Sequence, residues 1–335
     1  MRPTLLGALT ALLAALLATP PATAAPPRIE SRGVVFDVSN INETSVPCTS
    51  DGQQYHLRGR LVGPTKDLDG VSGALRVNVL VHDLGAGGWF WNLRSHPAYD
   101  YATRLAAQGE TTLVLDRLGY GASRLADGNA TCLGAQANML HQVVQHLTSG
   151  RYDYTSSRFG ATPAAAHVVT HGLGIGAAIA QVEAGTFDDV DGLVLMSWTD
   201  RGATSLATRA AARHSRDCVG TDYAPRPSMR ELFFSSASGA VRRAVVHRQD
   251  DDPCGDVGSL SPLVLGSNLE AREVDAPVLL LYGGKDKVNR ASAREDQAAS
   301  YSTRVTTRTF PGAGYALPLE KQAGQVRAAV LRWLR

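Results

Sequence analysis

The chain has 335 residues, and its 33 Lys and Arg residues nearly balance its 31 Asp and Glu residues, which gives a formal net charge of +2. Its basic residues form no large cluster, so the composition argues against a nucleic-acid partner. The length fits one large α/β domain with an inserted piece, or two domains, and it is sufficient to bury a substantial core.

The first 25 residues have the features of a secretory signal peptide. Arg2 precedes an apolar run over residues 5–17, and a small-x-small signal at residues 22–24 places cleavage near Ala24 or Ala25. The run is short for a transmembrane helix, although an uncleaved anchor is the alternative. No later apolar run is long enough to cross a bilayer. The sequence therefore predicts a secreted protein with no transmembrane segment in the mature chain.

Strand and helix patterns alternate through the rest of the chain. Patterns typical of strands occupy residues 33–38, 55–63, 76–81, 112–115, 166–170, 192–196, 277–282 and 305–310. Helical patterns occupy residues 99–108, 133–147, 174–183, 291–301 and 319–334. The first two strands alternate polar with apolar residues and predict an antiparallel pair. The others predict a mostly parallel central sheet with helices on both faces.

Residues 199–275 interrupt this alternation. They contain Arg-rich helical pieces, several Pro residues and an acidic run. An irregular insert after a strand predicts a cap over the carboxyl edge of the sheet, where ligands bind in such folds. We therefore expect a core of residues 26–198 and 276–335, with residues 199–275 as a cap or lid.

Four cysteines follow the predicted cleavage site, and export permits disulfides. Four cysteines allow three pairings. We favour Cys48–Cys132 and Cys218–Cys254, because Cys218 and Cys254 share the inserted segment. The absence of C-x-x-C spacing argues against a metal site formed by these cysteines.

The stretch of residues 166–183 reads as a strand, a tight turn and a helix rich in small residues. This is the frame of a nucleophile elbow, whose motif is G-x-S-x-G. We match the motif to residues 170–174, which places Gly172 at the position of the nucleophile. Glycine has no side chain that could attack a carbonyl. It adopts the strained turn at little cost, whereas another residue would pay about 1–3 kcal/mol.

Several motifs in order resemble those of the α/β-hydrolase superfamily over residues 33–335. They are the segment Val79–His82 with the Gly-rich loop after it, the loop Asp116–Ser123, the elbow, the strand and turn Leu279–Asp286, and the turn Phe310–Tyr315. The resemblance implies the α/β-hydrolase fold and a triad in the order Ser, acid, His. The matching positions hold Gly172, Asp286 and Tyr315, so only the acid is retained.

The resemblance also implies an oxyanion hole formed by the backbone amides of Leu84 and Leu173. Asp83 stands where the family usually has glycine, and its carboxylate would repel a developing oxyanion. We further expect His82, Trp89 and His171 near the pocket, although His82 and His171 also fit a packing role and Trp89 fits the core.

Other residues offer alternatives to this site. Ser123 and Ser197 are candidate replacement nucleophiles, but neither is expected on a strained turn. The acidic run 250–252, together with Asp256, could bind a cation, but its spacing matches no known loop and favours a solvated charge run. We therefore predict no metal and no cofactor.

These residues are compatible with two functions. The first is an exported α/β-hydrolase-fold protein without a working Ser-His-Asp triad, which binds a small apolar or amphipathic ligand, or a protein partner, beneath the cap. The second is an active enzyme that hydrolyses an ester or lactone by another arrangement, or performs non-hydrolytic chemistry with Tyr315 and Asp286 in the same pocket. A purely structural role is a third possibility, for which the sequence offers no positive sign.

Overall fold

A computed structural model of the chain describes residues 27–227 and 229–335. The predicted signal peptide lies outside these residues. In the part of the chain that the structure describes, no helix combines the length and the apolar character needed to cross a membrane.

The core of the molecule is a nine-stranded sheet with the strand order β11-β10-β7-β6-β3-β4-β2-β1-β5. The strands are β1 (Ile29–Ser39), β2 (Gln54–Pro64), β3 (Arg76–Val81), β4 (Thr111–Leu115), β5 (Asp153–Tyr154), β6 (His167–Leu173), β7 (Gly192–Met196), β10 (Val278–Gly283) and β11 (Val305–Phe310). β1 and β2 pair antiparallel with each other, and their outer partners β5 and β4 are also antiparallel to them. All other neighbouring strands in this order, from β4 across to β11, are parallel. The predicted antiparallel pair and the mostly parallel sheet are both confirmed.

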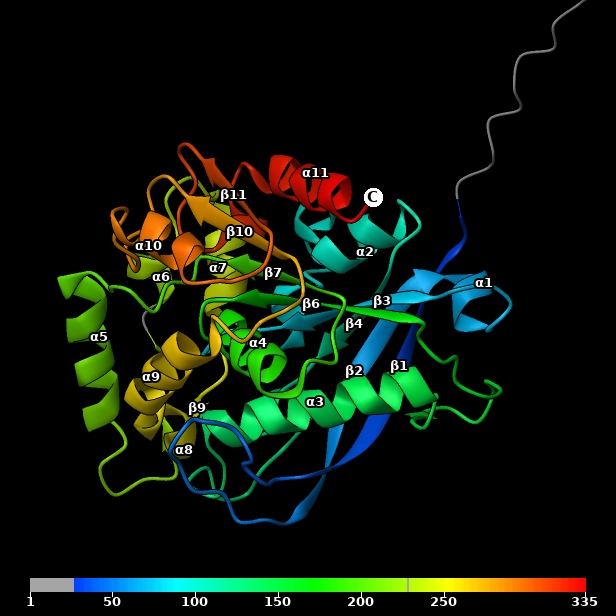
Figure 1. The fold of residues 1–335 in the computed structure, drawn as a ribbon, viewed down its shortest axis with the longest axis horizontal. Helices are drawn as coiled ribbons and strands as arrows, with labels where there is room; N and C mark the ends of the chain where they lie inside the picture. Colours follow the sequence, from blue (N-terminus) through cyan, green and yellow to red (C-terminus); the bar gives the residue numbers. More distant parts are fainter. Residues whose placement is uncertain (1–26, 228) are drawn as a thin grey trace, which may run out of the picture.

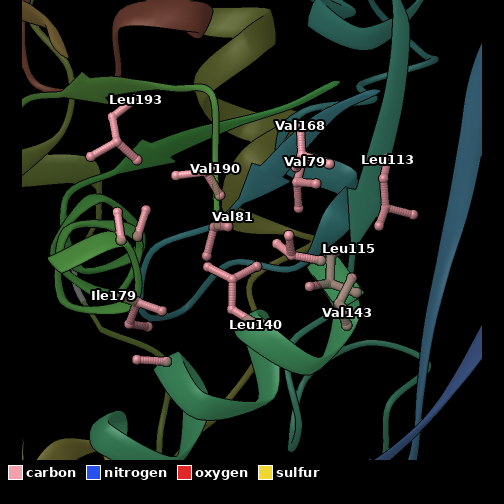
Figure 2. Close-up of a cluster of buried hydrophobic side chains, with 14 of the residues drawn as sticks. Val79, Val81, Leu113, Leu115, Leu140, Val143, Val168, Ile179, Val190 and Leu193 are labelled. Atoms are coloured by element: carbon pink, nitrogen blue, oxygen red, sulfur yellow. The ribbon is translucent and has the colours of Figure 1, made fainter. Parts of the chain in front are cut away.

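Helices cover both faces of this sheet (Figure 1). One face carries α2 (Tyr101–Ala106) and α11 (Ala323–Trp333), and the other carries α3 (Leu133–Ser149) and α4 (Ile175–Phe187). Because both faces are buried at the centre of the sheet, β7 and β10 are buried at every position and are almost entirely apolar, whereas the edge strand β11 is largely exposed and rich in Thr. Figure 2 shows one of the two cores, where strand residues such as Val79, Val81 and Leu113 lie against Leu140 of α3 and Ile179 of α4.

The chain between β7 and β10 forms several short elements. They are α5 (Ser205–Arg216), β8 (Tyr223–Ala224), α6 (Met229–Leu232), α7 (Gly239–Val246), β9 (Asp252–Pro253), α8 (Cys254–Gly258) and α9 (Leu260–Glu270). The last of them, α9, packs against α4 and α3 and so extends the helical layer of the core. We call residues 199–258 the cap segment. The remaining helices are α1 (Thr65–Leu68) and α10 (Ala293–Ala299).

Two disulfides join distant parts of the chain. Cys48 is bonded to Cys132 and Cys218 to Cys254, as the sequence predicts, with sequence separations of 84 and 36 residues. Closing loops of this size stabilises a fold by roughly 4 kcal/mol each, because the unfolded chain loses conformational freedom. Disulfides persist in oxidising surroundings, so this pair indicates an extracellular environment.

Candidate active site

The strand β6 and the helix α4 meet in a tight turn at Gly174, which has φ +54° and ψ −117°. We expected the apex of this turn at Gly172. The structure instead keeps Gly172 inside β6, paired with Val81 of β3 and Leu195 of β7. The predicted strand ends at residue 170, whereas β6 continues to Leu173 because partner strands flank it on both sides. The apex therefore lies two residues later than predicted.

Two further glycines make the turn possible. A Cβ atom at Gly172 would lie 2.3 Å from Cα of Ala177, and one at Gly176 would lie 2.3 Å from the carbonyl oxygen of Val81. Strand and helix therefore approach too closely for any side chain at these two positions. Residues 172–176 thus supply the G-x-apex-x-G spacing of a nucleophile elbow, with glycine at all three key positions.

Tyr315 occupies the space next to the apex. A Cβ atom at Gly174 would lie 1.6 Å from the Tyr315 hydroxyl oxygen and 2.4 Å from Oδ2 of Asp83. The place that a nucleophile's side chain would need is therefore filled by a phenol and a carboxylate. The Tyr315 hydroxyl donates a 2.6 Å hydrogen bond to Oδ2 of Asp83.

The other oxygen of Asp83 binds two backbone amides. Oδ1 accepts hydrogen bonds from Leu84 N at 2.8 Å and from Ile175 N at 3.0 Å. We expected Leu84 and Leu173 to supply this amide pair. With the apex at Gly174, the amide that follows it belongs to Ile175, while Leu173 is still part of β6 and pairs with Met196. A pair of amides in this position is the arrangement of an oxyanion hole, and Asp83 fills it.

Burial sets the charge states of the pair. It raises the pKa of Asp83 to about 6, although the hydrogen bonds from Tyr315, Ile175 and Leu84 act in the opposite direction. Burial, together with the negative charge of Asp83, raises the pKa of Tyr315 well above its ordinary value of 10. At neutral pH Asp83 is therefore a carboxylate and Tyr315 a neutral donor, so Tyr315 is not a base there.

We predict that Asp83→Asn removes part of the pH dependence of stability. A carboxyl group whose pKa is higher in the folded state stabilises the fold when protonated, so its contribution is present below pH 4 and lost as the pH rises through about 6. A shift from 3.8 to about 6 corresponds to roughly 3 kcal/mol. Urea denaturation should show the parent losing about this much more than the variant between pH 4 and pH 7.5. Parallel curves for the two proteins would contradict the assignment.

Asp286 lies near the site but is not bonded to Tyr315. Its Oδ1 accepts hydrogen bonds from Val288 N at 2.7 Å and Asn289 N at 3.2 Å, and its Oδ2 accepts one from Asn289 Nδ2 at 2.9 Å. Burial raises the pKa of Asp286. The turn that carries Asp286 contacts the turn before Tyr315, because Lys285 N donates to the carbonyl oxygen of Ala313. Asp286 therefore orders its own loop in this structure.

The remaining residues that we expected near the pocket form hydrogen bonds of their own with other parts of the chain. His82 is buried between the carbonyl oxygen of Asp83, at 2.8 Å from Nδ1, and Arg117 N, at 3.1 Å from Nε2. His171 is buried between the Tyr101 hydroxyl and Oδ1 of Asn78. Both histidines thus hold core elements together.

Trp89 is half-buried, and its indole nitrogen lies 3.4 Å from Oδ2 of Asp250. Ser197 has φ +51°, so it does lie in the strained left-handed region, contrary to our expectation. Neither alternative serine is nonetheless free to attack a substrate. Ser123 is fully buried and donates to the carbonyl oxygen of Asp116, and Ser197 is fully buried and donates to the carbonyl oxygen of Tyr315.

The cap segment covers the site on the side of Tyr315. The ring of Phe233 packs on Tyr315 with 4.7 Å between the ring centroids, and the Phe233 carbonyl oxygen accepts from Ala316 N. Glu320, fully buried, accepts hydrogen bonds from Ser235 N and Ser236 N. As a result Tyr315 is only 4 % exposed.

Three of the surface cavities lie away from the elbow, and none of these three is lined by Gly174, Asp83 or Tyr315. One lies between β11 and α11, one on α7, and one at the amino ends of the strands near Arg76 and His167. None of these three cavities is the pocket that we expected beneath the cap, where Asp83 and Tyr315 are both buried.

We expected the acidic run of the cap segment to be a solvated charge run, but this is true only of Asp251, which is exposed, and in part of Asp250, which is half-buried. Asp252 is fully buried, accepts from Gly85 N, and lies 2.8 Å from Nε2 of His214. Asp256 is fully buried and forms an ion pair with Arg117 at 2.8 Å. These two carboxylates find donors from distant parts of the chain, which sequence spacing does not reveal. They fix the cap segment onto the loops that follow β3 and β4.

Gly174 and Ile175 are site residues that we did not predict from the sequence. The spacing Gly172-Leu173-Gly174-Ile175-Gly176 contained the signal, because it repeats glycine where the elbow needs close approach on both sides of its apex. The sheet order, the turn after β6 and the paired amides together define an α/β hydrolase.

The chain belongs to the alpha/beta hydrolase family, whose sequence pattern matches residues 79–329. An esterase from Thermogutta terrifontis is 19% identical, with a TM-score of 0.58 over 90% of this chain and 98% of that one. A monoacylglycerol lipase from Paleococcus ferrophilus is 18% identical, with a TM-score of 0.59 over 78% of this chain and 95% of that one. A hydrolase from Pseudomonas aeruginosa is 20% identical, with a TM-score of 0.58 over 87% of this chain and 98% of that one. These similarities show the fold. No curated protein matches the sequence.

Proposed function

We propose that this protein is an exported member of the family that does not catalyse acyl transfer and that binds a small apolar or amphipathic ligand beneath the cap segment. The observation that carries the proposal is the filling of the site. The Tyr315 hydroxyl takes the space of a nucleophile at Gly174, and the Asp83 carboxylate occupies the amides of Leu84 and Ile175.

The contacts of Tyr315 argue against the rival function, in which Tyr315 is backed by Asp286 and donates to a ligand carbonyl. Its hydroxyl donates to Asp83 instead, and Asp286 is occupied by Val288 and Asn289. The predicted export signal and the two disulfides support secretion of the protein.

The chemistry of the filled site indicates the kind of ligand. Two amides that bind the Asp83 carboxylate would also bind the carboxylate of a ligand, while Phe233 of the cap segment supplies an apolar surface against Tyr315. Such a ligand must displace Asp83 and move the cap segment. A saturated fatty acid has both a carboxylate for the two amides and an apolar chain for the apolar surface.

We predict that Asp83→Gly increases the affinity for decanoate by about tenfold or more, because the two amides lose their internal partner. Calorimetric titration of parent and variant with decanoate measures the change, and decanol, which lacks the carboxylate, is the control ligand. Equal affinities of the variant for decanoate and decanol, or no binding by either protein, would contradict the ligand assignment.

A further inference from the structure

A second polar cluster lies at the far end of α4, away from the elbow. His141 of α3, Glu183 of α4 and Asp189, which follows α4, each offer one ligand atom, and these atoms all lie within 4.8 Å of one another. Since Gly174 precedes α4 and Asp189 follows it, the length of the 13-residue helix, about 20 Å, separates the two sites. Leu140 and Val190, the chain neighbours of His141 and Asp189, belong to the buried cluster of Figure 2.

The ring of His141 is held in a defined orientation. Its Nδ1 lies 2.7 Å from Oδ2 of Asp189, and the ring stacks on Phe187 with 3.9 Å between centroids and an interplanar angle of 11°. The side chains of His141 and Asp189 are 16% and 24% exposed, so solvent reaches the cluster from this side. An ion can enter the cluster by the same path.

Glu183 contributes a buried carboxylate to the cluster. Its side chain is fully buried, and among the described residues no donor group reaches either of its carboxylate oxygens. Oγ1 of Thr186 and Oδ1 of Asp189 are also buried without a partner. Four of the ten such side-chain atoms in the described part of the chain are thus oxygens of residues 183–189. A buried carboxylate without a donor is costly, and a bound cation removes that cost.

The geometry points to a divalent transition-metal site formed by His141, Glu183 and Asp189, with Zn²⁺ as the ion that suits it. One imidazole nitrogen and two carboxylate oxygens match the ligands that Zn²⁺ takes in proteins, and they neutralise its two charges. Ca²⁺ and Mg²⁺ prefer sites made of oxygen alone. Two ligands of a tetrahedral zinc ion lie about 3.4 Å apart. Binding therefore requires the 2.7 Å contact between His141 and Asp189 to widen, and any ligand atoms that lie as far apart as 4.8 Å to approach each other.

A shared proton is the competing arrangement. Burial raises the pKa of Glu183 well above its ordinary value, and both the negative charge of Asp189 and a hydrogen bond between the two carboxyl groups act in the same direction. A protonated Glu183 could then donate to Asp189 with no metal present. The two arrangements differ in what the protein binds, so a binding experiment separates them.

The test is titration of the full, oxidised chain with Zn²⁺ after treatment with a chelator, followed by calorimetry and by the melting temperature. We expect one Zn²⁺ per chain and a higher melting temperature in its presence, with no response to Mg²⁺. Glu183→Gln keeps the shape of the side chain and should weaken Zn²⁺ binding by at least about tenfold. His141→Ala should do the same, and it serves if Glu183→Gln does not fold.

The control is His167→Ala. His167 and Asp191 form a similar pair at 3.0 Å, but they are 55% and 48% exposed and belong to no three-residue cluster among the described residues. This variant should bind Zn²⁺ as the parent does. A parent that binds no Zn²⁺, or a Glu183→Gln variant that binds it equally well, would overturn the proposal. The first outcome would leave the shared proton as the explanation of the cluster.

Discussion

Combining Gly174→Ser, Tyr315→His and Asp83→Gly should create serine-hydrolase activity in this chain. Gly174→Ser supplies the nucleophile on the turn, Tyr315→His supplies a base, and Asp83→Gly frees the amides of Leu84 and Ile175. Asp286 is the residue that we predict at the acid position of the family. Because nucleophile, base and oxyanion hole act as a unit, each single change should give little or no activity.

The single variant Gly174→Ser should in addition be less stable than the parent. A serine at φ +54° adopts a strained backbone conformation, which costs about 1–3 kcal/mol, and its Cβ atom would collide with the Tyr315 hydroxyl. Tyr315→His shortens the side chain and should recover part of this loss. Melting temperatures of the single and double variants measure both effects.

Labelling by a fluorophosphonate and turnover of p-nitrophenyl esters measure the activity of the triple variant. The matched control carries Gly174→Ala in place of Gly174→Ser, and so has the same turn without a hydroxyl. We expect labelling and turnover in the serine variant only. A folded triple variant without either would show that Asp286 and Tyr315 are not spaced for a triad.

Asp256→Ala should lower the free energy of unfolding by about 3–5 kcal/mol, because it leaves the Arg117 guanidinium buried without its partner. Arg117 is 2% and Asp256 0% exposed, and one Arg117 nitrogen, Nη2, already lacks a partner among the described residues. The Tyr120 hydroxyl, which also donates to Asp256, would lose its acceptor. Urea denaturation of the oxidised proteins measures the change.

A matched control comes from the same acidic run. Asp251 pairs with Arg226 at 3.7 Å, and both side chains are more than half exposed. Asp251→Ala should therefore cost at most about 1 kcal/mol. If Asp251→Ala and Asp256→Ala destabilise the protein equally, the buried pair does not anchor the cap segment.

The sequence predicts most of the fold, because both faces of the sheet are covered. The buried strands 76–81 and 192–196 are mostly apolar runs between turn residues, and the structure confirms them at the same bounds. The edge strand 305–310 is also confirmed at its predicted bounds, although it is largely exposed, because it is rich in β-branched residues. Helix ends are less well predicted. The last helix begins at Ala323 rather than at residue 319, because residues 317–319 form a separate 3-10 turn.

The position of the elbow could not be fixed from the sequence alone. Glycines alternate at positions 172, 174 and 176, so the motif fits in two registers, and only the strands on either side of β6 decide between them. The role of Asp83 depends on the same choice. Because Ile175 rather than Leu173 follows the apex, it is the Ile175 amide that donates to Asp83. The carboxylate that we expected to repel an oxyanion therefore occupies the position that the oxyanion would take.

Treatment of the purified parent chain with a fluorophosphonate, followed by peptide mapping, tests the absence of acyl-transfer chemistry most directly. We expect no labelled peptide and no turnover of short p-nitrophenyl esters above that of the heat-denatured protein, since Gly174 offers no nucleophile and the oxyanion amides are occupied by Asp83. A labelled peptide that contains Ser123 or Ser197, together with matching turnover, would contradict the proposed loss of this chemistry.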